Sequence, residues 1–187
     1  MSIKPIDGEV KREVRRKLSI NSGLSPKNTV ATNFPVTTDA YQTASGSPSV
    51  RDAFVAKISS DGVILFATYF GGSRVDDAHA IGIDSERNIY LSGRTYSSDF
   101  PMANPIQTAR SDIGTIDGSS DNTSDTFISK LSADGSTLIY STYFGGDRYD
   151  LPRDLFVDPT GSIYVVGQTH SSDIITTANA IRLLLPF

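Results

Sequence analysis

Hydrophobic and polar residues alternate with a period of two along much of the chain, and this pattern predicts β-strands. Phe54, Ala56 and Ile58 alternate with residues of the opposite face within 53–59. Ser-Ser-Asp-Gly then provides a turn, and 64–70 is rich in β-branched and aromatic residues. These features predict a β-hairpin.

The same kind of hairpin recurs three more times. Strands are predicted at 79–84 and 89–95, at 126–132 and 138–144, and at 153–158 and 163–169, with polar Gly, Asp and Ser turns between them. No helical period lies between these strands. Four short strands per unit predict an all-β fold of antiparallel, four-stranded β-propeller blades.

An internal repeat underlies this recurrence. Shifting the chain by 74 positions aligns 68–99 with 142–173 without a gap, and 15 of the 32 positions are identical. Upstream, "DAFVAKISSDG" from Asp52 pairs with "DTFISKLSADG" from Asp125 at an offset of 73. Partial copies begin at Thr32 and Ser172, so the chain holds about two and a half units.

These motifs resemble a known family. "DAFVAKISSDG", "ATYFGG", "IGIDSERNIYLSGRT" and "SSDFP" are similar to the bacterial SBBP-type β-propeller repeats over about residues 32–181. The resemblance implies a repeat propeller, commonly part of a larger exported or cell-surface protein, and implies no catalytic residues. The second unit departs from the pattern, since Ile174 and Ile175 stand where the first has Phe-Pro.

The expected organisation follows from the repeat. Residues 31–181 are expected to form propeller repeats, with one full blade at about 78–144 flanked by half blades and an insertion loop at 100–124, whose polar, glycine-rich middle at 109–125 is expected at the surface. Residues 1–30 carry no repeat and are helical or disordered, and 182–187 form a non-repeat end. Within 8–20, Val10, Val14 and Leu18 would share one face of a short amphipathic helix.

An isolated piece of this size raises a physical difficulty. Propellers close with about four to eight blades, so two and a half units leave apolar faces uncovered and the outer strand edges unpaired. Three solutions remain: a fragment of a longer protein, a ring built from several copies, or an open stack. We expect the fragment, because both ends cut across a repeat.

Charge and composition limit the partners. The net charge of -4 provides no basic surface for nucleic acid, and no run of about 18 apolar residues predicts a membrane span. The chain has no cysteine, which excludes disulfides and thiolate metal sites. The charged N-terminus does not read as a signal peptide, so the compartment is open between this observation and the exported setting that the resemblance implies.

The recurring Thr-Tyr-Phe-Gly-Gly motif predicts the joint between blades. Its aromatic residues would end the outermost strand, its glycines would supply the positive φ needed to turn toward the next blade, and an aspartate four residues on would accept backbone N–H bonds. A cation or ligand role for that aspartate is the alternative. The predicted joint residues are Tyr69, Phe70, Gly71, Gly72, Asp76, Tyr143, Phe144, Gly145, Gly146 and Asp150.

Other candidate chemistry is sparse. Asp84 and Asp158 precede turns and are expected to stabilise them. The oxygen-rich stretch 117–125 lacks the spacing of a calcium loop, so a solvated loop is expected there. His79 and His170 stand at non-equivalent repeat positions without metal-ligand spacing, and no nucleophile motif is present.

We therefore expect a non-catalytic propeller module that needs no cofactor or metal. It would act as a scaffold or binding surface for an unidentified protein or glycan, with further blades from a longer chain or from other copies. Two alternatives are part of a propeller-type hydrolase or lyase, which would need His79, Arg153 or Asp154 at the channel, and a lectin-like ring.

Overall fold

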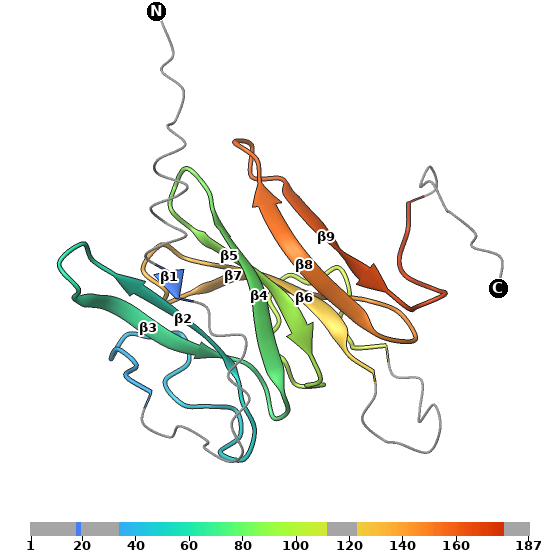
Figure 1. Ribbon diagram of the computed structural model, residues 1–187, viewed down its shortest axis with the longest axis horizontal. Coiled ribbons are helices and arrows are strands. Elements are labelled where there is room, and N and C mark those ends of the chain that lie inside the picture. Colours follow the sequence, from blue (N-terminus) through green and yellow to red (C-terminus); the bar gives the residue numbers. More distant parts are fainter. Residues whose placement is uncertain (1–17, 20–33, 112–122, 178–187) are drawn as a thin grey trace, which may run out of the picture.

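A computed structural model describes residues 18–19, 34–111 and 123–177, and these residues form antiparallel β-sheets (Figure 1). The middle sheet has the order β4-β5-β6-β7, with β4 at Asp76–Ile83, β5 at Ile89–Thr95, β6 at Asp125–Leu131 and β7 at Leu138–Phe144. This is one complete four-stranded blade, and it confirms the all-β fold class of propeller blades.

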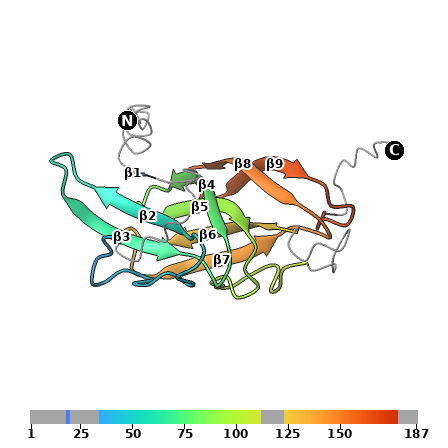
Figure 2. The ribbon, with the colours of Figure 1, turned by 60° about the horizontal axis from the view of Figure 1, so that its bottom comes forward.

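Half blades flank the complete one. On one side β2 (Ala53–Ile58) pairs with β3 (Ile64–Phe70), and on the other side β8 (Asp150–Val157) pairs with β9 (Ile163–Thr169). Figures 1 and 2 both show β4 lying between the β2–β3 hairpin and β8. By their repeat positions, β2 and β3 are the third and fourth strands of their blade, and β8 and β9 are the first and second of theirs.

The N-terminal segment contributes one short strand. Leu18–Ser19 form β1, which pairs antiparallel with Lys57 and Ala56 at the edge of β2 opposite β3. At these two positions the chain is extended, so the helical prediction is wrong there. The rest of that prediction, and the predicted non-repeat end at 182–187, lie outside the described residues.

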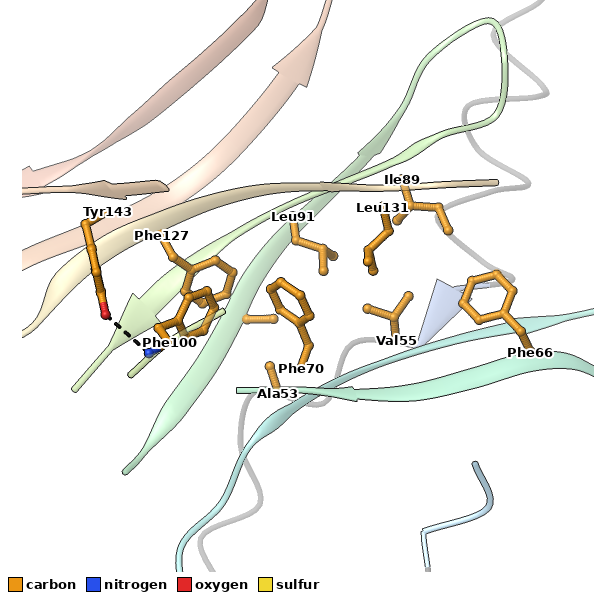
Figure 3. Close-up of a cluster of buried hydrophobic side chains, with 11 residues drawn as sticks. Ala53, Val55, Phe66, Phe70, Ile89, Leu91, Phe100, Phe127, Leu131 and Tyr143 are labelled. Atoms are coloured by element: carbon orange, nitrogen blue, oxygen red, sulfur yellow. Dashed lines mark hydrogen bonds between the residues drawn. The ribbon is translucent and has the colours of Figure 1, made fainter. Parts of the chain in front are cut away.

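The two faces of the middle blade bury two separate apolar clusters. The larger cluster joins β2–β3 to the middle blade and includes Phe70, Leu91, Phe127 and Leu131, each with no more than 1% of its surface exposed (Figure 3). Aromatic rings interlock at its centre, since the Phe100 ring stacks on that of Phe127 at 4.5 Å between centroids.

The second cluster joins the middle blade to β8–β9. Ala80 and Tyr90 meet Leu155 and Val157, and Ile163 and Val165 pack at its margin. A β-bulge at His79 shifts the alternation of β4: strand positions two apart normally share a face, but Ala78 lies in the larger cluster and Ala80 in the smaller one.

The outer edge strands are covered, and here the expectation of unpaired edges is wrong. The Ala103 and Ser141 backbones form an isolated bridge on β7, and on β3 the N–H of Tyr69 donates to the carbonyl of Gln42 at 3.1 Å. Each blade thus pairs its edge strand with the segment that follows its second strand in the repeat. This blocks edge-to-edge pairing at the outer edges of β3 and β7.

The segment from residue 100 also differs from the predicted insertion loop. Phe100 is 3% exposed, and its N–H donates to the Tyr143 hydroxyl at 3.2 Å. The N–H groups of Ile106 and Gln107 both donate to Thr142 Oγ1. The described part, 100–111, is therefore an edge cover, whereas 112–122 lies outside the described residues.

The core makes a direct prediction about stability. Leu91→Ala should lower the free energy of unfolding by about 3 kcal/mol, because the side chain is fully buried between two blades. Val63→Ala, at a side chain that is 60% exposed, should change it by less than about 0.5 kcal/mol. Urea denaturation of the full chain measures both, and equal losses would contradict the assigned core.

Candidate functional site: the joints between blades

Two joints connect the three blades. In the first, Tyr69 and Phe70 end β3, Gly71 and Gly72 make the crossing, and Asp76 begins β4. In the second, the same places are taken by Tyr143 and Phe144 at the end of β7, by Gly145 and Gly146, and by Asp150 at the start of β8. The recurring motif thus lies where one blade passes to the next.

One aspartate oxygen organises each crossing. Asp76 Oδ2 accepts the Gly72 N–H at 2.7 Å and the Ser97 hydroxyl at 2.8 Å, and the Ser97 oxygen accepts the Arg74 N–H at 2.9 Å. The side chain is 1% exposed. A buried, charge-assisted cluster of this kind fixes the direction in which the chain enters the next blade.

The second joint repeats these bonds. Asp150 Oδ2 accepts the Gly146 N–H at 2.8 Å and the Ser171 hydroxyl at 2.8 Å, and Ser171 Oγ accepts the Arg148 N–H at 2.9 Å. The agreement extends to the first glycine of each pair, whose N–H donates at 3.0 Å to Gln42 Oε1 in one joint and to Gln107 Oε1 in the other.

The glycines are required by space, and the expected positive φ is wrong. The glycines with positive φ among the described residues are Gly62, Gly135 and Gly161, which lie in hairpin turns. A side-chain carbon at Gly71 would instead lie 2.8 Å from both Asp52 Cγ and Asp76 Oδ2. At Gly145 the corresponding distances are 2.7 Å to Asp125 Cγ and 2.8 Å to Asp150 Oδ2.

A second carboxylate therefore faces the first across each glycine. Asp52 and Asp125 open the recurring "DAF" and "DTF" motifs, and the sequence repeat marks them without indicating their partner. Asp52 Oδ2 accepts the Gly46 N–H, and Asp125 Oδ2 accepts the Ser111 N–H and a bond from Gln107 Nε2. Asp125 lies in the oxygen-rich stretch predicted as a solvated loop, yet it is fully buried in the joint.

Burial and mutual repulsion perturb these acids. The pKa of Asp76 is raised from 3.8 to about 7, mainly because burial removes its hydration. The charge of Asp52 acts in the same direction, and the hydrogen bonds that Asp76 accepts act against the shift. In the second joint burial raises the pKa of Asp125 to about 7, with the Asp150 charge acting in the same direction. Burial also raises the pKa of Asp52.

The remaining candidates occupy simpler settings. Asp84 accepts backbone N–H bonds from Glu86 and Asn88 in the β4–β5 turn and pairs with Lys130 Nζ at 3.0 Å, and these bonds hold its pKa at about 2 despite partial desolvation. Asp158 receives the N–H groups of Thr160 and Ser162 in the corresponding turn of β8–β9.

The innermost strands carry the basic candidates. His79 Nδ1 lies 3.0 Å from the Pro152 carbonyl, and Arg153 donates to Gln168 Oε1 at 2.8 Å. Both residues occupy the bulge position of their strand, 74 positions apart. Within the described ranges, no group of three His, Cys, Asp or Glu side chains lies close enough to hold a metal ion.

Two segments of the chain match a known repeat family. A family model described as a β-propeller repeat, SBBP, matches residues 65–101 and again 139–175. The chain carries two SBBP repeats. Each match starts in an outermost strand, crosses a joint and ends just after the second strand of the next blade, so one SBBP repeat spans parts of two blades.

Neither a curated relative nor, among the described residues, a membrane-spanning helix was found. The comparison with curated proteins gave no match. In the part of the chain that the structure describes, no helix has the length and apolar character needed to cross a membrane.

A pair of serines tests the joint. Ser97→Ala removes the hydroxyl that links Asp76 to the Arg74 N–H and should lower the free energy of unfolding by about 1–3 kcal/mol. Ser92 is equally buried, but its hydroxyl has no hydrogen-bond partner, so Ser92→Ala should be neutral or stabilising. If both variants lose the same stability in urea melts, the joint network contributes nothing specific.

The buried acids predict an unusual pH dependence. A carboxyl whose pKa is higher in the folded state binds more protons there, so its contribution to stability is complete below about pH 3.8 and is lost as the pH rises through about 7. The Asp76→Asn variant keeps an acceptor oxygen but cannot ionise. Relative to this variant, the wild-type free energy of unfolding should fall by at least about 1 kcal/mol from pH 5 to pH 8.

The difference between variant and wild type is the quantity to measure. Burial lowers the pKa of His79 below 6.5, so this residue makes stability rise with pH below about 6.5 and opposes the carboxyl effect in the wild-type curve. The contribution of His79 is the same in Asp76→Asn and cancels in the difference. Parallel curves for the two proteins would show that Asp76 is ionised throughout this range.

Proposed function

We propose that this chain is a non-catalytic β-propeller module that serves as a scaffold or binding surface for a protein or a glycan. The observation that carries the proposal is the contrast between repeat-equivalent residues. Tyr90 in the complete blade is 2% exposed, whereas Tyr164 at the same position of β9 is 59% exposed. Phe156 and Val166 beside it are 49% and 62% exposed.

The half blades support a need for further blades. The β2–β3 and β8–β9 hairpins each lack half the strands of the complete blade, and every propeller blade buries its faces against neighbours. The missing strands would come from a longer chain, of which this sequence is a fragment, or from other copies. The module would be functional when its ring is complete.

The polar groups near the channel support a structural use more than catalysis. His79 and Arg153 contact a backbone carbonyl and a glutamine, and the acids with raised pKa lie buried at the joints rather than beside these residues. Two small cavities of about 130 Å³ border β8–β9, well below the roughly 300 Å³ at which small-molecule pockets begin. A partner is therefore proposed to bind the loops and rim.

An exported or cell-surface setting is also proposed, on the family resemblance alone. Fractionation of cells that express the natural gene, followed by immunodetection of the chain, would test this part separately.

Binding and turnover can be measured on one preparation. The full chain is applied to a printed glycan array and incubated with chromogenic ester and glycoside substrates. We expect saturable glycan binding and no turnover above the buffer rate. Turnover that disappears in His79→Ala, Arg153→Ala or Asp154→Ala, with the far-UV circular dichroism unchanged, would contradict the non-catalytic assignment.

A further inference from the structure

The two half blades at the ends of the described chain are complementary. β8 and β9 are the first and second strands of a blade, and β2 and β3 are the third and fourth. Each SBBP match begins in the outermost strand of one blade and ends after the second strand of the next blade. A segment built of such repeats therefore has the outer strands of a blade at its first end and the inner strands of a blade at its other end. The two half blades lie on opposite sides of the middle blade (Figures 1 and 2).

We propose that a second copy of this chain completes the blade: β9 of one copy pairs antiparallel with β2 of the other, so that β8–β9 and β2–β3 form one four-stranded sheet. This inference rests on the proposed function and names the source of the missing strands. It is a case of strand addition at an open sheet edge.

The repeat fixes the register of this pairing. Inside the chain β5 pairs with β6 over seven positions, from Ile89 opposite Leu131 to Thr95 opposite Asp125. Offsets of 74 and 73 carry these positions onto β9 and β2. Between copies, Ile163 would therefore face Ile58, and Thr169 would face Asp52.

Charge complementarity supports the same register. In the middle blade Lys130 Nζ lies 3.0 Å from Asp84 Oδ2 and 4.9 Å from the Tyr90 ring centroid, and the Tyr90 hydroxyl donates to the same carboxylate.

On β8–β9 the equivalent acid and phenol are already together, since the Tyr164 hydroxyl lies 3.4 Å from Asp158 Oδ2; Tyr164 is exposed and Asp158 is half-buried. The equivalent lysine is Lys57 on β2, at the other end of the described chain. A second copy would bring Lys57 to this acid and phenol and restore the three-residue contact of the complete blade.

The exposed apolar side chains of β8–β9 would also be covered in this assembly. Phe156, Tyr164 and Val166 lie on the face of β8–β9 that corresponds to the Tyr90 face of the middle blade, and the Tyr90 face packs on the following blade. In the assembly this following blade is the middle blade of the second copy, which presents the partly buried Ile81 and Ile83. Two incompletely covered apolar surfaces would then bury each other.

Strand β1 occupies part of the same edge. It makes two register pairs with β2, at Lys57 and Ala56, against the seven of the β5–β6 pairing. The longer pairing offers more backbone hydrogen bonds and buries more side chain, so β9 of a second copy would displace β1. The N-terminal strand then acts as a temporary cover for the β2 edge.

The strand count sets the size of the assembly. Within the described residues, strands β2 to β9 amount to eight, which is two blades of four. Since closed propellers have about four to eight blades, about two to four copies would complete a ring. The chain mass is 20.1 kDa, so the closed assembly would weigh two to four times that value.

Light scattering coupled to size-exclusion chromatography tests the proposal on the full chain. The wild type should elute as a discrete dimer, trimer or tetramer. Lys57→Glu should weaken association at least tenfold, because it places a second carboxylate beside Asp158 of the other copy. Asp158→Asn keeps the acceptor oxygen for the turn, and combined with Lys57→Glu it should recover part of the lost association.

Asp84→Asn is the matched control, since it makes the same change at the equivalent position of the complete blade. It should lower the free energy of unfolding and leave the assembly mass unchanged. A monomeric wild type with native circular dichroism at millimolar concentration, or a Lys57→Glu effect that Asp158→Asn does not alter, would overturn the proposal. A folded monomer would leave the proposed binding role intact, whereas turnover would overturn that role and leave this assembly untouched.

Discussion

Burial on both faces is the constraint on which this structure depends. The middle blade satisfies it with two clusters, one shared with β2–β3 and one with β8–β9. Its second strand shows the principle most clearly, since Leu91 enters one cluster and the adjacent Tyr90 enters the other, and both are buried. The β8–β9 half blade receives this cover on one face, and its exposed Phe156, Tyr164 and Val166 lie on the other.

The joints turn this stacking into a fixed geometry. In each joint a buried aspartate side chain accepts bonds from a serine hydroxyl and a backbone N–H group of the crossing, and the bonds of one joint are repeated in the next. Burial of these carboxyls raises the pKa of one member of each pair to about 7, and the second carboxyl across each glycine acts in the same direction. We therefore expect the stability of the joints to decrease as these acids ionise.

Much of the fold follows from the sequence because the repeat is strong. Alternation and turn chemistry place the strands, and the self-alignment marks the joint aspartates and glycines before any contact is known. The role of Gly71 was not accessible in this way, because local sequence suggests a backbone conformation, whereas the real requirement is the approach of Asp52 from another strand. Spatial partners across a chain crossing leave no periodic pattern.

The edge cover eluded prediction for a related reason. Residues 100–111 look like a polar insertion, yet Gln107 bonds to a glycine, a threonine and an aspartate that lie 18 to 38 positions away. The sequence shows that "QTA" at Gln42 repeats "QTA" at Gln107, but it does not show that each glutamine bonds to a joint glycine. Completion of blades between copies is likewise suggested by the repeat, and its register is defined only once the β5–β6 pairing is known.

Hydrogen exchange of the wild-type chain tests the central claim most directly. Peptides that cover β5 (Ile89–Thr95) and β9 (Ile163–Thr169) are compared at low and high protein concentration. If copies complete each other's blades, β5 is protected at both concentrations, and protection of β9 rises toward that of β5 as concentration increases. Free exchange of β9 at every concentration, with β5 fully protected, would contradict the account.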